Sequence, residues 1–169
     1  SGQHNQDRII YIYSIILDNM KKYQVINFHH LLSQIDLQKV DKEARAKLIS
    51  LDIILGDIVD EHNAEVEKVK TRLSKGHEED IREVSALFAE LQGAEGEKKA
   101  EIEGKIAQHT EYIAIQNQLN EEVNRRLVED VNVDIEKIAS ADLAQWCADS
   151  GLSITLDLLR EFRRAGFTL

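Results

Sequence analysis

The clearest pattern along the chain is a long amphipathic helix, which the sequence predicts from Asp36 to Ser74. Mostly apolar residues recur there at spacings of three and four, with a slip of one residue near Val66, which places them on one face of a helix. Further apolar residues widen this face beyond what a simple two-helix seam requires. The row is Leu48, Leu51, Leu55, Ile58, His62, Val66, Val69 and Leu73, and the flanking residues are Ile49, Ile53, Ile54 and Val59.

Two more helices are predicted after this one. The first carries Ile81 to Leu91 in helical register, and the second runs from about Glu97 to Glu129. Between them, Gln92–Gly96 contains two glycines, which predict a turn. The pattern therefore predicts a mainly α protein, built on a long antiparallel, coiled-coil-like helical hairpin over residues 36–130.

The two ends of the chain carry strand-like patterns. Ile9–Leu17 is rich in β-branched and aromatic residues, which favours a buried strand, with a buried helix as the alternative. Tyr23–Phe28 resembles a second strand, so residues 1–35 are predicted as an N-terminal segment with a β-hairpin. Val131–Ile135 alternates apolar and polar residues, and we expect it to pair with Tyr23–Phe28 as a small β element that joins the two ends.

Residues 131–169 are predicted to hold that strand and two short helices, and to pack with the rest as one domain. Ser140 is a candidate N-cap for the first of these helices, and Gly166 closes the second. Three arginines near the C-terminus could bind a phosphate or a carboxylate, but compensation of the helix dipole is the preferred explanation. They are Arg160, Arg163 and Arg164.

Composition and charge exclude several classes of function. The formal net charge is -10, whereas phosphate binding needs clustered Lys and Arg, so we predict neither nucleic-acid nor anionic-membrane binding. The longest apolar run, Ile9–Leu17, is too short to span a bilayer and lacks the features of a signal peptide. We therefore expect a cytoplasmic protein, in a host cell or associated with a virion. The absence of proline permits long helices, and aromatics are only 5%.

The polar residues form no recognised catalytic or metal-binding motif. Cys147 is the single cysteine, so neither an internal disulfide nor a cysteine zinc cluster is expected. Di-iron helical bundles use Glu-x-x-His, but the residues three before His62, His77 and His109 are Val59, Ser74 and Ile106. We predict no catalytic residue, no metal ligand and no cofactor, and hence a protein that is not an enzyme.

A few segments resemble a known group of proteins. A basic start at Met20-Lys21-Lys22 precedes a long charged helix. The segments Asn120–Leu127, Val131–Ile135 and Ser140–Leu143 then follow one another near the end. This order resembles small uncharacterised phage and prophage proteins, often encoded among tail genes. The resemblance covers roughly residues 20–75 and 115–165, and it implies a helical hairpin fold and no catalytic residues.

These observations predict a non-enzymatic structural or assembly protein, of phage or prophage origin, that acts through helical interfaces. We expect it to form a homo-oligomer and to bind an unidentified protein partner. The alternative is an acidic inhibitor or decoy that occupies a basic site on another protein. The residues predicted to form the interface are Leu48, Leu51, Ile54, Leu55 and Ile58.

Overall fold

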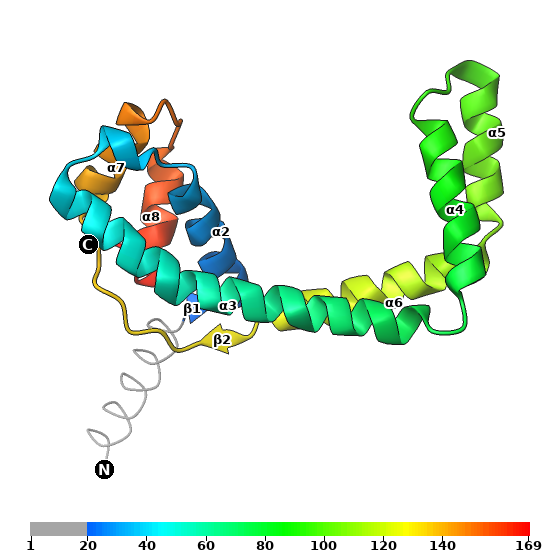
Figure 1. Cartoon of the computed structure of the whole chain (residues 1–169), viewed down its shortest axis with the longest axis horizontal. Coiled ribbons are helices and arrows are strands. Elements are labelled where there is room, and N and C mark those ends of the chain that lie inside the picture. Colours follow the sequence, from blue (N-terminus) through cyan, green and yellow to red (C-terminus); the bar gives the residue numbers. More distant parts are fainter. Residues whose placement is uncertain (1–19) are drawn as a thin grey trace, which may run out of the picture. The chain divides into compact units, whose positions relative to one another are not determined.

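A computed structural model describes residues 20–169, so the predicted strand at 9–17 lies outside the described residues. The fold is mainly α, as predicted, and Figure 1 shows its long helix α3. The elements are β1 (Met20–Lys21), α2 (Lys22–Ser33), the 3-10 turn η1 (Leu37–Lys39), α3 (Lys42–Ser74), α4 (Glu78–Leu91), α5 (Gly96–Ala107), α6 (Thr110–Leu127), β2 (Asp130–Val131), α7 (Ser140–Asp149) and α8 (Leu156–Ala165).

Contacts divide the chain into two compact units. Among the described residues, the first unit contains residues 20–62 together with Leu127–Leu169, and the second unit contains Asn63–Arg126. Helix α3 contributes to both units. This grouping differs from the predicted division into segments 1–35, 36–130 and 131–169, because the first part of α3 packs with residues 20–40 and 131–167.

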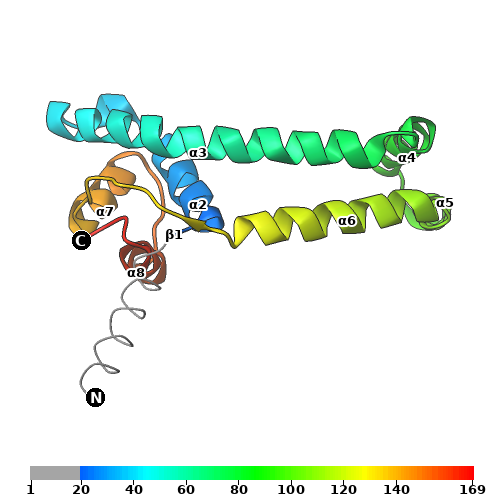
Figure 2. The same ribbon diagram turned by 90° about the horizontal axis from the view of Figure 1, so that it is seen from below.

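The core of the first unit lies between α2, α7, α8 and the first part of α3. Figure 2 shows these four helices from below. Three phenylalanines meet at its centre. Phe28 stacks on Phe167 with ring centroids 4.3 Å apart, and Phe162 meets Phe28 edge-on at 4.9 Å. Large buried rings of this kind contribute a major share of the apolar burial in a small core.

A two-residue β-ladder joins the two ends of the first unit. Met20 pairs with Val131 and Lys21 with Asp130, in antiparallel register. The prediction of a joining β element is therefore confirmed, but the predicted strand Tyr23–Phe28 is wrong because these residues lie in α2. The physical reason is the spacing of the apolar side chains. The helical spacing buries one face of α2, and this outweighs the β-branched composition. That face consists of Val25, Phe28 and Leu32.

The alternating segment 131–135 is buried on one side but is mostly unpaired. Val131, Val133 and Ile135 pack against the core, whereas Asn132 and Asp134 are exposed. Only Val131 belongs to a strand. The alternation therefore predicted which side chains face inward, but not a strand of five residues.

The C-terminus is anchored beside the start of α7. Ile138 forms a parallel bridge with Thr168, and the Leu169 N–H donates to the Ile138 carbonyl at 2.8 Å. Ser140 is not the N-cap, which is Ala139. The Ser140 hydroxyl instead donates to the Leu169 carbonyl at 2.7 Å. The left-handed Gly166, with φ of 94°, ends α8 as predicted.

The second unit contains the end of α3, the hairpin of α4 and α5, and α6. The predicted turn between α4 and α5 is present, with Leu91 and Gly96 as the flanking helix ends. The predicted third helix is broken, because α5 ends at Ala107 and α6 begins at Thr110. Few apolar residues of this unit are fully buried. They are Val69, Val84, Ile102 and Ile115.

Candidate functional site

The residues predicted to form an interface lie mostly inside the first unit. Leu48, Leu51 and Leu55 are buried in its core, and Ile58 is half-buried against that core. Ile54 is 39% exposed at the edge of the buried row. Leu48, Leu51 and Leu55 therefore meet the rest of their own chain, which leaves a different part of α3 free for a partner.

The part of α3 that remains exposed carries two isoleucines one turn apart. Ile49 is 46% exposed and Ile53 is 60% exposed. At about 100° per residue, both point to the flank of α3 away from Ile54. Residues at helical spacing extend this row toward both ends of the segment. We call the row the outer stripe: Lys42, Ala46, Ile49, Ile53, Gly56 and Asp60.

Two hollows lie along the outer stripe, both in the first unit. One has a volume of about 300 Å³ and is bordered by Leu37, itself 36% exposed, and by Ile49. The other, also about 300 Å³, is bordered by acidic residues near Ile53. His29 reaches into its edge, with Nε2 2.8 Å from Asp52 Oδ1. The outer stripe is thus apolar at its centre and acidic toward Asp60.

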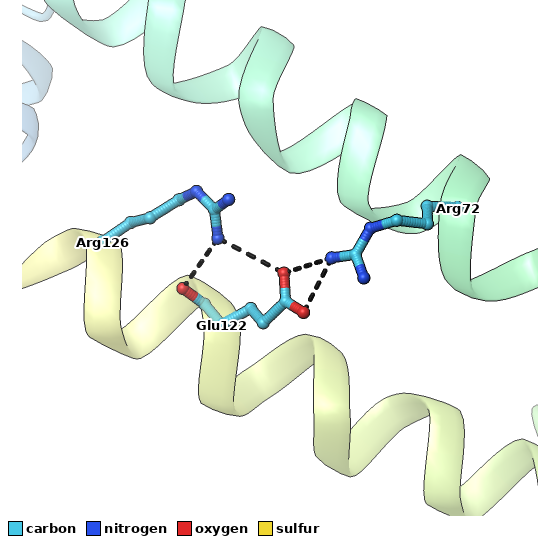
Figure 3. Close-up of polar contacts among 3 residues, drawn as sticks. All are labelled: Arg72, Glu122 and Arg126. Carbon is cyan, nitrogen blue, oxygen red and sulfur yellow. Dashed lines mark hydrogen bonds and ion pairs between the residues drawn. The ribbon is translucent and has the colours of Figure 1, made fainter.

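Polar contacts hold α3 and α6 together in the second unit (Figure 3). Arg72 Nη2 donates to both oxygens of the Glu122 carboxylate, at 2.7 and 2.6 Å. Arg126 Nη1 donates to the Glu122 carbonyl at 3.2 Å and lies 3.4 Å from Oε2. The hydrogen bond from Arg72 is the main cause that holds the pKa of Glu122 below its usual range.

Two histidines of the second unit pair with carboxylates. His109 Nδ1 lies 2.6 Å from Asp80 Oδ1, and His77 Nδ1 lies 3.2 Å from Glu111 Oε2. Asp80, exposed Glu83 and His109 also offer one potential ligand atom each within 4.8 Å of one another. The prediction that the chain has no metal ligands rested on residue spacings within single helices. This group instead combines two residues of α4 with His109, which lies between α5 and α6.

Cys147 is an unfavourable nucleophile. Its side chain is fully buried in the core of the first unit. Burial raises the pKa of the thiol, because a thiolate is poorly solvated there. The thiol therefore stays protonated near neutral pH and packs as a small apolar group.

None of the described helices combines the length and the apolar character needed to cross a membrane. Comparison with models of protein families found no match to the chain. Comparisons with curated proteins and with solved structures found no match either. The role of the chain is therefore inferred from its own residues.

Proposed function

We propose that this chain is a non-enzymatic structural or assembly protein that acts through helical protein–protein interfaces. The observation that carries the proposal is the exposed pair Ile49 and Ile53 on the outer stripe. Adjacent apolar side chains on a surface favour association, because a partner removes them from water. The opposite side of α3 is buried in the core, so this surface is held rigidly.

A second copy of the chain and an unidentified protein are the proposed partners. The outer stripe runs along a single helix, which suits packing against another helix. The resemblance to small phage and prophage proteins supports an assembly role of phage origin. The proposed setting is the host cytoplasm or the virion.

An acidic inhibitor or decoy is the second candidate, and one feature of the surface favours it. The hollow beside Ile53 is bordered by Asp52, Asp57 and Asp60. Such a surface would attract a basic partner and lose affinity steeply as salt is raised. Apolar packing between helices depends far less on salt, so an ionic-strength series separates the two candidates.

Two matched substitutions in the full chain test the leading proposal. Ile53→Glu places a charge on the outer stripe, and Ile54→Glu places the same charge on the other flank of α3. We expect Ile53→Glu to abolish self-association in sedimentation velocity and Ile54→Glu to leave it intact. Loss with Ile54→Glu alone would instead support the interface predicted from the sequence. Unchanged association in both variants would contradict assembly through this part of α3.

A further inference from the structure

The outer stripe has the spacing of a coiled-coil seam. Its six residues follow one another at spacings of four, three, four, three and four. Side chains at these spacings form one line along a helix that a second helix can cover. The stripe lies wholly within the first unit, and all of its residues are exposed except the half-buried Gly56.

The order of side chains along the outer stripe is complementary to the same order reversed. Counted from its middle, between Ile49 and Ile53, each residue has a counterpart at the same distance on the other side. Ile49 corresponds to Ile53, a small residue to a small residue, and a cation to an anion. The two outer pairs are Ala46 with Gly56, and Lys42 with Asp60.

We propose that a second copy of this chain packs antiparallel along the outer stripe, related by a two-fold axis between Ile49 and Ile53. This inference rests on the proposed function and adds the partner, the surface and the register. In this register, Ile49 of each copy packs on Ile53 of the other. A two-fold interface repeats every contact, so the central layer holds four isoleucines.

Charge selects the antiparallel direction. Lys42 and Asp60 are both exposed and lie about 27 Å apart along α3. An antiparallel copy brings Lys42 to Asp60 at both ends of the seam, whereas a parallel copy in register sets Lys42 against Lys42. Lys42 is also in the first turn of α3, where the helix dipole disfavours a cation. A carboxylate from the second copy would offset that cost.

The layers between the centre and the ends contain small residues. Ala46 and Gly56 have little or no side chain, so neither adds bulk of its own between the two helices. A β-carbon added at Gly56 would lie 3.4 Å from His29 Nε2, so this side of α3 is bordered by the His29 ring. The second copy would therefore contact the His29 ring at the Gly56 layer of the seam.

Carboxylates beside the seam meet like charges in this arrangement, and two of them, Asp52 and Glu43, have a partner in their own chain. Asp52 lies near the axis and is hydrogen-bonded to His29 at 2.8 Å. Glu43, which would face Asp57 of the other copy, lies 3.8 Å from Lys47 Nζ. Because the apolar area is small, we expect a dimer with a dissociation constant in the micromolar range.

A charge exchange in the full chain tests the register. We expect Lys42→Glu and Asp60→Lys each to weaken the dimer about tenfold or more, because each substitution changes two attractive pairs into repulsive ones. The double variant Lys42→Glu with Asp60→Lys restores both pairs and should dimerise within about threefold of the unmodified protein. The dissociation constants are measured by sedimentation equilibrium.

Lys68→Glu provides the control, because it makes the same charge change on α3 at an exposed site outside the stripe. It should leave the dimer unchanged. The register is wrong if the single variants dimerise as tightly as the unmodified protein. It is also wrong if the double variant does not regain the dissociation constant of the unmodified protein. In both cases the protein still assembles. If the unmodified protein is a monomer, the proposed function fails with it.

Discussion

Arg72 on α3 and Glu122 on α6 lie fifty residues apart in the sequence and meet through both oxygens of the carboxylate, at 2.7 and 2.6 Å. Arg126 joins them from the next turn of α6. The second unit buries few large apolar side chains, so this contact is one of the features that fix how its two antiparallel helices lie against each other.

Glu122 should make the stability of the second unit depend on acid pH. Its pKa is lowered in the folded state, so the unfolded state binds more protons as pH falls. The stabilisation is fully present above the unfolded pKa and is lost as pH falls toward the folded pKa. We expect the protein to be more stable than Glu122→Gln near neutral pH, and this difference to shrink below about pH 4.5. Thermal unfolding of both proteins followed by circular dichroism gives the measurement. A difference in Tm between the two proteins that stays constant from neutral pH to below about pH 4.5 would refute the stabilising role of the Glu122 carboxylate.

Phe167 should be essential to the first unit although it is the third residue from the end. Its ring is fully buried against Phe28 and Phe162. We expect Phe167→Ala to cost about 3–5 kcal/mol in urea unfolding. Leu169→Ala is the matched control, because Leu169 is 69% exposed and should change stability by less than about 0.5 kcal/mol. Similar midpoints for the two variants would contradict this account of the core.

Two glycines should respond to alanine with opposite signs. Gly166 has φ of 94°, where a β-carbon is strained, so Gly166→Ala should destabilise by about 1–2 kcal/mol. Gly104 is inside α5 with open space around it, so Gly104→Ala should stabilise by about 1 kcal/mol. Both changes are read as shifts in Tm. A stabilising Gly166→Ala would show that the C-terminal cap of α8 is wrongly described.

The group of Asp80, Glu83 and His109 is expected to hold no stoichiometric metal. The His109 Nδ1 atom is already within hydrogen-bonding distance of Asp80, and Glu83 is exposed, so an ion must displace a bond and compete with water. Elemental analysis of protein purified without chelators makes the measurement. One equivalent of zinc, iron or manganese, lost in His109→Gln, would overturn the expectation.

The sequence predicted the helices well where local chemistry decides them. Glycine spacing located the turn after Leu91, and the rows of three and four predicted most of α3. The break at His109 was not predicted, because the segment contains no proline or glycine there and its bond to Asp80 depends on tertiary packing. The short helix α2 was mistaken for a strand because its β-branched residues also follow helical spacing.

The candidate surface was harder to predict than the fold. Hydrophobic periodicity identifies residues that are buried, and it therefore selected Leu48, Leu51 and Leu55, which serve the chain's own core. The outer stripe has apolar residues only at its centre, so its amphipathic signal is weak. Ile49 and Ile53 widen the apolar face of the predicted helix, but only the folded structure reveals which flank of α3 the rest of the chain leaves uncovered.

The mass of the unmodified full chain in solution shows whether the chain associates with itself. Light scattering coupled to size exclusion should be run over a series of concentrations through the micromolar range. We predict a mass that rises with concentration toward twice the 19.3 kDa of one chain. A mass that stays at 19.3 kDa throughout the series would contradict assembly through α3.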